Sequence, residues 1–499
     1  MEFASTPRLP GGRRPTGDDV KAAQVARSAI RGSGALLARQ LVTFGVTFLG
    51  GVLLARILTP ADFGGYALIL FIAGLARLLV DGGLAATLVQ QRDEPSRDEW
   101  STVLTTQTAI AVALFLALQL CVPLLAGLLP GVEGLDLALR ISVFAVLIAP
   151  LSSVSIALIE RRLQFGRVGL ILMIQPVLFN LVAVILAWSG AGLTGLGIAL
   201  AVSTAAVAPF ALWASRTVPR YGFKRDSMTG RLKFGIPFIG ANIVSTLKDS
   251  VNPLFIGAMF GATFAGYITW AQQLAVVGTY LLAIVARLLF PTFARLQDSP
   301  DALRRAVGAS VFWANAVVAP ITLFVVINAI QITTDVYDPK WLGAVTTLLF
   351  LSASNVISPT MSVLLALMNA LGRAVVPLIF SLVWFAGTWI FVPLLAAPLG
   401  FEAYGVANVI VSAFGLPLLY VARKNLSMKT VLDSLVPWAL GTVAIFVGYL
   451  CATALADLPG LAALVVSGVI GVSLYVGLLL VVARGKIKAI RSTLAHAKD

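Results

Sequence analysis

Residues 234–257 read Phe-Gly-Ile-Pro-Phe-Ile-Gly-Ala-Asn-Ile-Val-Ser-Thr-Leu-Lys-Asp-Ser-Val-Asn-Pro-Leu-Phe-Ile-Gly, an apolar run long enough to cross a lipid bilayer. Two adjacent charges, Lys248 and Asp249, lie in the middle of it. A charge inside a bilayer is costly unless it is paired or hydrated. Neighbouring side chains on a helix point about 100° apart, so these two cannot lie along each other as residues i and i+4 do. We therefore expect at least one of them to face a protein interior or a water-filled cavity.

The composition of the whole chain indicates a polytopic membrane protein. Hydrophobic residues make up 59% of it and charged residues only 12%, whereas about a quarter of a soluble protein is charged. Both cysteines, Cys121 and Cys451, lie in apolar runs, and the one histidine, His496, lies in the C-terminal tail. The sequence thus offers no histidine-based metal centre and no histidine general base near a candidate site, which disfavours an enzyme and predicts no cofactor.

Apolar segments of spanning length recur along the chain and predict an all-α integral membrane protein with about fourteen transmembrane helices. They are residues 35–57, 64–89, 101–127, 136–158, 167–188, 192–213, 235–259, 265–290, 308–333, 342–368, 374–396, 402–422, 435–456 and 461–483.

The placement of the 36 Lys and Arg residues predicts the orientation of these helices. Most lie in the two tails and in the connections that follow even-numbered helices, whereas the opposite side carries only Arg56, Arg140 and Lys340. Because basic residues favour the cytoplasmic side, both termini are expected in the cytoplasm. The same clustering beside spans argues that the net charge of +14 reflects topology and membrane lipid, and not nucleic acid.

A repeated motif predicts two lobes. Residues 61–67, Ala-Asp-Phe-Gly-Gly-Tyr-Ala, match residues 262–268, Ala-Thr-Phe-Ala-Gly-Tyr-Ile, at an offset of 201. Parallel repeats of this kind form two bundles with a central cavity between them. The expected organisation is a basic, largely disordered cytoplasmic arm without a signal peptide (1–32), an N-lobe of six helices (33–214), a basic cytoplasmic loop (215–233), a C-lobe of six helices (234–422), two additional helices (435–483) and a basic cytoplasmic tail (484–499).

Other charges also fall inside the expected spans. Arg77 and Asp81 are four residues apart and could pair on one helix face, whereas Arg39 and Arg287 have no carboxylate within a turn and could extend to the membrane surface. None of the charges recurs at the offset of 201, and bases outnumber acids, which favours an anionic cargo. We expect Lys248 and Arg77 to face one central cavity.

Uncharged polar residues complete the candidate site. Gln272 and Gln273 follow the second copy of the repeated motif and could face a sugar, although most in-span amides join helices to one another. The predicted substrate-cavity residues are Arg39, Arg77, Asp81, Lys248, Asp249, Gln272, Gln273 and Arg287.

Several motifs resemble a known family. They are Leu53-Leu-Ala-Arg-Ile-Leu-Thr-Pro-Ala-Asp-Phe-Gly-Gly-Tyr66, Asp81-Gly-Gly-Leu84, Phe255-Ile-Gly257, Ala265-Gly-Tyr267, Pro291-Thr-Phe-Ala-Arg-Leu296, Tyr337-Asp-Pro-Lys-Trp341 and Asn369-Ala-Leu-Gly-Arg373. In this order they resemble the polysaccharide transporter (Wzx-type flippase) family of the multidrug/oligosaccharidyl-lipid/polysaccharide exporter superfamily, over nearly all of residues 33–483.

The resemblance implies a function. It implies a flippase that moves undecaprenyl-pyrophosphate-linked oligosaccharide across the bacterial inner membrane, for exopolysaccharide, capsule or O-antigen assembly, through a cationic cavity between two lobes. The implied partners are this lipid-linked substrate, membrane lipid and, where the pathway is assembled, a polysaccharide polymerase and export machinery. Asp81 and Asp249 could accept a coupling proton, and sodium coupling is an open alternative.

Two other function classes compete with this one. A cation-coupled drug antiporter of the same superfamily would need acidic residues in the membrane, but bases outnumber acids here. A membrane polymerase or ligase would need a sizeable outer loop with catalytic groups, but the loops expected on the outer side are short.

Overall fold

The computed structural model describes residues 39–91, 93–224, 239–240, 242–373, 375–455 and 458–484, with the side chains of 281, 283–288 and 290–291 left out. The predicted arm 1–32, part of the predicted loop 215–233 and nearly all of the tail 484–499 lie outside these ranges. All regular secondary structure in the described residues is helical, with no strand among them. The prediction of an all-α fold is therefore confirmed.

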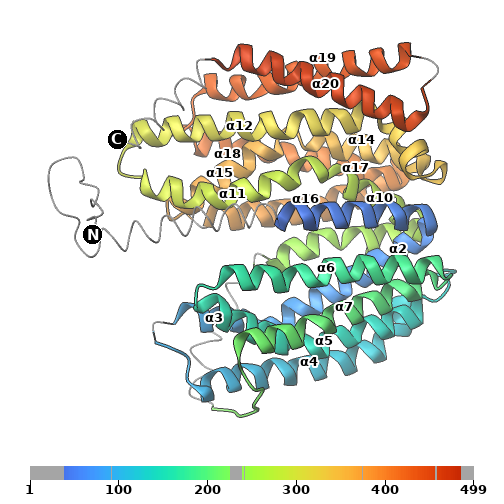
Figure 1. Cartoon of the computed structure of the whole chain (residues 1–499), viewed down its shortest axis with the longest axis vertical. Coiled ribbons are helices and arrows are strands. Elements are labelled where there is room, and N and C mark those ends of the chain that lie inside the picture. Colours follow the sequence, from blue (N-terminus) through green and yellow to red (C-terminus); the bar gives the residue numbers. More distant parts are fainter. Residues whose placement is uncertain are drawn as a thin grey trace, which may run out of the picture.

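The N-terminal half is a bundle of long helices (Figure 1). Its members are a first helix, Arg39–Ile57, followed by α2 (Pro60–Asp81), α3 (Leu84–Gln90), α4 (Arg97–Ala126), α5 (Leu135–Arg161), α6 (Phe165–Trp188) and α7 (Gly192–Ser215). Among these, α5 and α6 both pack on α7, and α4 packs on α5.

The start and end of α2 follow directly from its sequence. The Thr59 hydroxyl accepts from the backbone N–H of Asp62, and the Asp62 carboxylate accepts from the Thr59 N–H at 2.8 Å. This reciprocal capping, with Pro60 in the first turn, fixes where the helix begins. The helix ends at Gly82, whose φ of 53° is in the left-handed region that glycine adopts most readily.

The C-terminal half has more broken helices. After helical residues 242–249 come a π-helical turn, η1 (Val251–Ile256), α9 (Gly257–Phe260), α10 (Ala262–Ala275), α11 (Val277–Arg295), α12 (Pro300–Ile327) and α13 (Ala329–Gln331). The π-helical η2 (Ile332–Tyr337) and 3₁₀-helical η3 (Pro339–Ala344) lead to α14 (Val345–Ser354), α15 (Ser358–Ala370), α16 (Val375–Leu399), η4 (Gly400–Glu402), α17 (Ala403–Ala413), α18 (Leu416–Val421), α19 (Met428–Ala454) and α20 (Gly460–Val482).

Ten helices within the described residues are long and apolar enough to cross a membrane, if the continuous stretch Val375–Val421 is counted as one. An eleventh candidate is the pair Pro339–Ser354 and Ser358–Ala370, which is bent by 43°. The chain is thus a multi-pass membrane protein, whereas fourteen spans and the internal repeat remain predictions.

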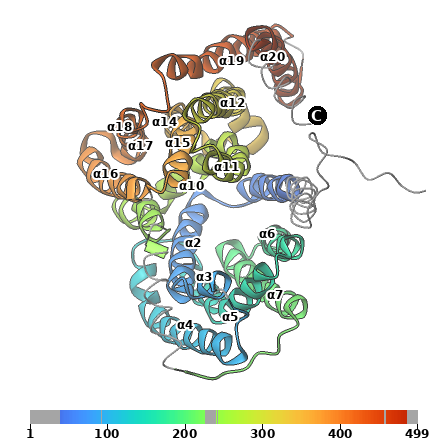
Figure 2. The same cartoon turned by 90° about the vertical axis from the view of Figure 1, so that its left-hand side faces the viewer.

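The helices form two groups that meet along one side of each. Viewed from one end, α2 to α7 lie together in one group and α10 to α18 in another (Figure 2). The last two helices, α19 and α20, lie at the edge, where α19 packs on α12. Buried hydrogen bonds fix them there, from the Tyr475 hydroxyl to the Ala316 carbonyl at 2.7 Å and from the Trp438 indole N–H to the Asn315 amide oxygen at 2.8 Å.

The two groups are in closest contact where α2 crosses α10. A Cβ on Gly266 would lie 1.7 Å from the Pro60 carbonyl oxygen, and a Cβ on Gly64 would lie 2.0 Å from the Ala262 carbonyl oxygen. Each glycine therefore admits the backbone of the opposite helix, and no other residue type fits at these two positions without displacement. Both belong to the repeated motif that the sequence singled out.

A tryptophan fills the contact next to this crossing. Trp341 is fully buried, stacks on Trp270 with ring centroids 5.5 Å apart, and meets the edge of Phe63 at 4.9 Å. Its indole N–H donates to the carbonyl of Ala55 at 2.9 Å. Aromatic rings from both halves thus exclude water from this end of the molecule.

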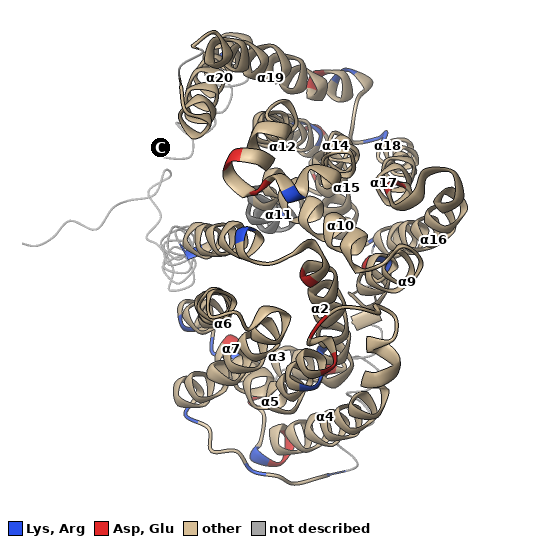
Figure 3. Ribbon diagram, turned by 90° about the vertical axis from the view of Figure 1, so that its right-hand side faces the viewer, with Lys and Arg blue, Asp and Glu red and all other residues tan. Residues whose placement is uncertain are grey.

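Charged side chains at the same end also bridge the two halves. Arg56 donates to the carbonyls of Val336 at 2.8 Å and Asp335 at 2.6 Å, and the Lys340 ammonium donates to the Arg56 carbonyl at 2.8 Å. Figure 3 looks onto this end, and most of the ribbon there is uncharged. We call the contacts of residues 55–66 with 262–270 and 335–341 the closed end.

Candidate substrate-binding cavities

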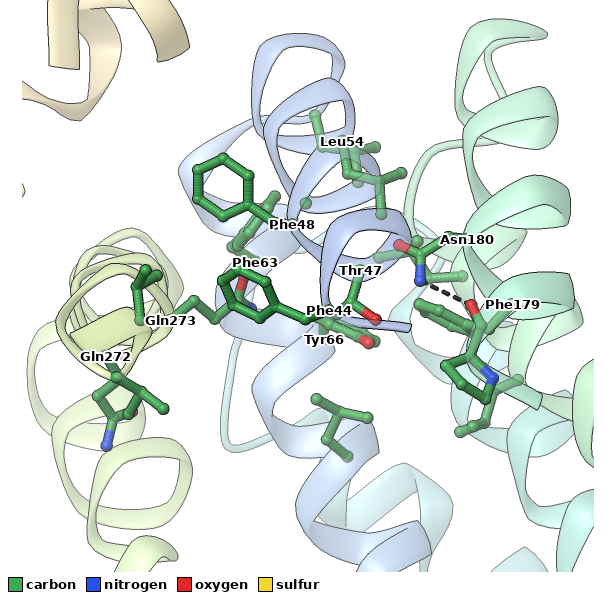
Figure 4. Close-up of a pocket in the computed structure, with 18 of the residues that line it drawn as sticks. Phe44, Thr47, Phe48, Leu54, Phe63, Tyr66, Phe179, Asn180, Gln272 and Gln273 are labelled. Carbon is green, nitrogen blue, oxygen red and sulfur yellow. Dashed lines mark hydrogen bonds between the residues drawn. The ribbon is translucent and has the colours of Figure 1, made fainter. Parts of the chain in front are cut away.

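A largely apolar cavity lies between the two helix groups. It has a volume of about 620 Å³ and is bounded by the first helix, α2, α6 and α7 from one group and by α10, α11 and Tyr337 from the other. Figure 4 shows aromatic side chains of the first helix, α2 and α6 gathered at this cavity, with Gln272 and Gln273 of α10 on its other side. We call it the aromatic cavity after its seven rings, which are Phe44, Phe48, Phe63, Tyr66, Phe179, Tyr280 and Tyr337.

Polar groups are placed among these rings. The predicted residue Gln273 lines the aromatic cavity together with Thr47 and Tyr66, and none of these three side chains has a hydrogen-bond partner within the described part of the chain. On the other side, the Gln40 amide donates to the Tyr280 hydroxyl at 3.0 Å. The cavity therefore offers free hydroxyl and amide groups beside apolar ring faces.

A second cavity, of about 660 Å³, lies within the C-terminal group and reaches α2 at Ala67, Leu70, Phe71 and Gly74. We call it the polar cavity because Lys248, Asp249, Asn252 and several hydroxyl side chains line it. Lys248 and Asp249 are its only charged lining residues among those that the structure describes.

The two charges of the opening stretch pair with each other. The Lys248 ammonium lies 2.6 Å from the Asp249 carboxylate, and their side chains are 22% and 56% exposed. The expectation that adjacent helical positions prevent such pairing is wrong, because the long Lys side chain reaches around the helix to its neighbour. Both charges nevertheless line a cavity, as expected of charges in mid-span.

The helix that carries this pair passes into the π-helical turn η1, and such turns are frequent at functional sites. Within η1, the Asn252 amide nitrogen donates to the Ala265 carbonyl at 3.2 Å and to the Thr269 hydroxyl at 3.0 Å. The Asn252 amide oxygen is buried without a partner among the described residues. This acceptor is therefore buried in the wall of the polar cavity, and a ligand does not reach it in this conformation.

Gln272 lies between the two cavities. It lines both of them, as do Leu70 and Val276, and its amide donates to the Tyr404 hydroxyl at 2.7 Å. The aromatic and polar cavities therefore adjoin at these three residues, which places two of the predicted site residues, Gln272 and Gln273, at the boundary and in the aromatic cavity.

Arg77 is separated from Lys248. The exposed Arg77 side chain lines a cavity of about 180 Å³ between α2, α5, α6 and α7, which shares Gly74 with the polar cavity and Leu70 with both larger cavities. The structure thus places Lys248 and Arg77 in adjoining cavities and not in a single one, because α2 lies between them.

Asp81 joins three helices instead of pairing with Arg77. Its carboxylate accepts from the Gln107 amide at 3.1 Å, from the Ser153 hydroxyl at 2.9 Å and from the Gly83 N–H at 3.2 Å. No ion pair with Arg77 forms within the described residues. These bonds hold the end of α2 to α4 and α5.

Replacing Asp81 with alanine should destabilise the N-terminal bundle by about 3 kcal/mol, because three donors to a charged acceptor would lose it. Thermal unfolding of the purified protein in detergent measures the loss. Asp136→Ala is the matched control, since the Asp136–Arg140 pair at 2.8 Å is exposed and surface pairs contribute less than about 1 kcal/mol. Equal effects of the two substitutions would contradict the role of Asp81.

Two predicted arginines, Arg39 and Arg287, are not placed in either of the two larger cavities. A Cβ on Gly169 of α6 would lie 1.8 Å from a guanidinium nitrogen of Arg39, so Arg39 packs against the backbone of α6. Arg287 is helical in α11, but its side chain is outside the described part of the structure. Arg39 therefore lines neither the aromatic nor the polar cavity, and the prediction for Arg287 falls outside the described side chains.

The aromatic lining was not predicted from the sequence. Phe44, Phe179 and Tyr280 belong to long apolar runs in which nothing distinguishes a cavity residue from a lipid-facing one. Tyr66 differs from these residues because it belongs to the repeated motif at residues 61–67, which the sequence singled out. The signal that could have found the others is the coincidence of aromatic residues with in-span amides such as Gln175 and Asn180, which line the same cavity.

Comparison with known proteins supports the fold. The structure resembles the lipid II flippase MurJ in an inward closed conformation, with a TM-score of 0.76 and 15% sequence identity over 91% of this chain and 99% of that one. It also resembles an inward-facing multidrug resistance MATE family transporter of the MOP superfamily, with a TM-score of 0.59 and 15% identity over 79% of this chain and 98% of that one.

Three bacterial relatives are similar in sequence. The succinoglycan biosynthesis transport protein ExoT of Rhizobium meliloti (strain 1021) is 29% identical over 59% of this chain and 60% of its own length. The lipopolysaccharide biosynthesis protein WzxC of Escherichia coli (strain K12) is 25% identical over 75% of this chain and 78% of its own length. The teichuronic acid biosynthesis protein TuaB of Bacillus subtilis (strain 168) is 26% identical over 58% and 61%. The chain thus spans about three fifths of the length of ExoT and TuaB.

The family follows from a match to the polysaccharide biosynthesis protein family over residues 53–346, which cover more than half of the chain. This stretch contains α2, the α2–α10 crossing and the Lys248–Asp249 pair. The match confirms the resemblance drawn from the motifs, and with the apolar spans it indicates a bacterial inner membrane protein. The chain belongs to the polysaccharide biosynthesis protein family and has the fold of the multidrug/oligosaccharidyl-lipid/polysaccharide exporter superfamily.

Proposed function

We propose that this protein is a flippase that moves an undecaprenyl-diphosphate-linked oligosaccharide across the bacterial inner membrane for polysaccharide assembly. The observation that carries this proposal is the pair of adjoining cavities, one lined by aromatic rings and free hydroxyl and amide groups, the other by the Lys248–Asp249 pair. A sugar linked to a diphosphate matches both linings, because the sugar suits the aromatic rings and polar groups and the diphosphate suits the lysine. The names of the bacterial relatives, which refer to transport and polysaccharide biosynthesis, support the same function.

The Lys248–Asp249 pair suits reversible binding of a diphosphate. An ammonium group has three N–H donors, and contact with Asp249 uses only part of this capacity. A phosphate can therefore bind Lys248 while Asp249 holds the ammonium in place. The nearby carboxylate also weakens binding by repulsion, so that the cargo is released on the other side of the membrane.

The transport cycle follows from the contact between the two helix groups. We infer two six-helix lobes related by the repeat at offset 201, within fourteen spans whose termini both face the cytoplasm. The closed end then faces the periplasm, because Arg56 and Lys340 lie on the side whose connections hold few basic residues. The α2–α10 crossing there opens when the lobes rock. Asp81 and Asp249 are the carboxylates available for coupling to a proton or sodium ion. No covalent chemistry is required.

A drug/cation antiporter is the second candidate because MATE transporters share this fold. Such a cargo needs an acidic site. The aromatic cavity has no charged lining residue among those described, and the one carboxylate of the polar cavity is paired with Lys248. These two features favour the lipid-linked cargo.

Reconstitution of the full chain into proteoliposomes tests the function. A fluorescent undecaprenyl-diphosphate-linked oligosaccharide should become accessible in the opposite leaflet faster than in empty liposomes, with no change in glycan length. Imposed proton and sodium gradients show whether either ion drives the step. Gradient-driven movement of organic cations without any lipid flipping would instead support the antiporter, and glycan elongation would support a polymerase.

A further inference from the structure

We propose that the aromatic cavity binds an uncharged part of the glycan, so that the sugars carried nearest the lipid are neutral. This inference rests on the proposed flippase function and specifies its cargo. The proposal divides the cargo between the two cavities, with neutral sugar rings in the aromatic cavity and the diphosphate beside Lys248.

The described lining of the aromatic cavity is uncharged. None of its lining residues within the described part of the chain is Lys, Arg, Asp or Glu. Arg39, on the first helix, packs against Gly169 of α6, and Lys248 lines the polar cavity. Arg77 lines the small cavity that adjoins the aromatic cavity at Leu70, Gln175 and Leu200, and it is not among the residues that line the aromatic cavity. A sugar carboxylate in the aromatic cavity would lose hydration without meeting a counter-ion in the described lining, which is strongly unfavourable.

The uncharged lining suits sugar hydroxyl groups. Tyr66 and Phe179 stack with their ring centroids 5.8 Å apart and their planes inclined by 13°, which fixes one wall of the cavity. Tyr66, Thr47 and Gln273 provide hydroxyl and amide groups that no described residue occupies. Sugars combine apolar C–H faces with groups that both donate and accept hydrogen bonds, so this lining matches them on both counts.

The size and position of the cavity agree with this cargo. A volume of about 620 Å³ is within the range of about 300–1,000 Å³ that is usual for small-molecule sites. The polar cavity begins at Leu70, Gln272 and Val276, which line both cavities. A glycan in the aromatic cavity can therefore extend its diphosphate into the polar cavity, towards Lys248, across this boundary.

The test compares two probes in proteoliposomes that contain the full chain. Both are fluorescent undecaprenyl-diphosphate-linked oligosaccharides of equal length, one with neutral hexoses only and one with a hexuronate in place of the hexose nearest the lipid. The neutral probe should be flipped about tenfold faster or more, because the cavity rejects the unpaired carboxylate. Equal rates, or faster flipping of the hexuronate probe, would overturn the proposal.

A variant that gains activity provides a second test, because a misfolded protein could not flip either probe faster. Gln273→Arg places a counter-ion in the aromatic cavity and should raise hexuronate flipping while it lowers neutral flipping. Gln90→Arg is the matched control, because Gln90 is exposed at the end of α3 and lines neither cavity, so its probe preference should equal that of the unmodified chain. A Gln273→Arg variant with unchanged preference would contradict the proposal. Failure of both probes to flip would instead count against the flippase function itself.

Discussion

Replacing Gly266 with alanine should open the closed end and reduce glycan export about tenfold or more. The added Cβ would lie 1.7 Å from the Pro60 carbonyl oxygen and 2.7 Å from its carbonyl carbon, and neither backbone atom can move aside alone. Overpacking of this kind costs about 1–3 kcal/mol. The clash exists only while α2 and α10 are in contact, so the whole cost disfavours the closed conformation and shifts the equilibrium towards the open one.

Cysteine labelling separates this shift from simple misfolding. The buried Leu58 at the closed end, replaced by cysteine in a chain without Cys121 and Cys451, should react faster with a membrane-impermeant thiol reagent when Gly266→Ala is also present. Gly45→Ala is the control, because its Cβ would have no neighbour within 4 Å and should change neither labelling nor export. Wild-type labelling and export in Gly266→Ala would show that the crossing is not the part that moves.

Replacing Lys248 with methionine should reduce flipping of the lipid-linked probe at least about tenfold, since it removes the only cation that the described residues place in the polar cavity. The same substitution leaves Asp249 without its partner, which alone could destabilise the protein. Lys248→Arg keeps the charge and should retain most of the activity.

A double variant distinguishes cargo binding from structural pairing. Lys248→Met combined with Asp249→Asn removes both charges, so the cost of an unpaired charge disappears and thermal stability should recover. Flipping should stay low, because no cation remains for the diphosphate. Recovery of flipping together with stability would assign the pair a purely structural role. Full export in a Lys248→Ala, Arg77→Ala double variant would exclude both cations from the transport path.

Part of the candidate site could be predicted from the sequence because charges are rare inside membrane spans. Lys248, Asp249, Arg77 and Asp81 were visible for this reason, and Lys248 and Asp249 do line a cavity. Their partners were not visible. Asp81 binds Gln107 and Ser153, which lie 26 and 72 residues further along the chain, and only the packing of α2 against α4 and α5 brings them together.

The sequence by itself determined the class of protein, because a bilayer requires long apolar segments and confines basic residues mostly to one side. It also determined the two glycines of the repeated motif, although it did not show that they meet. The tertiary structure decided which side chains share a space. The aromatic cavity takes its lining from at least six separate helical elements. The sequence of a single apolar span does not show whether its aromatic residues face lipid or a cavity. The Lys248–Asp249 contact likewise depends on the side-chain conformation of a flexible lysine within the cavity, which helical periodicity does not determine.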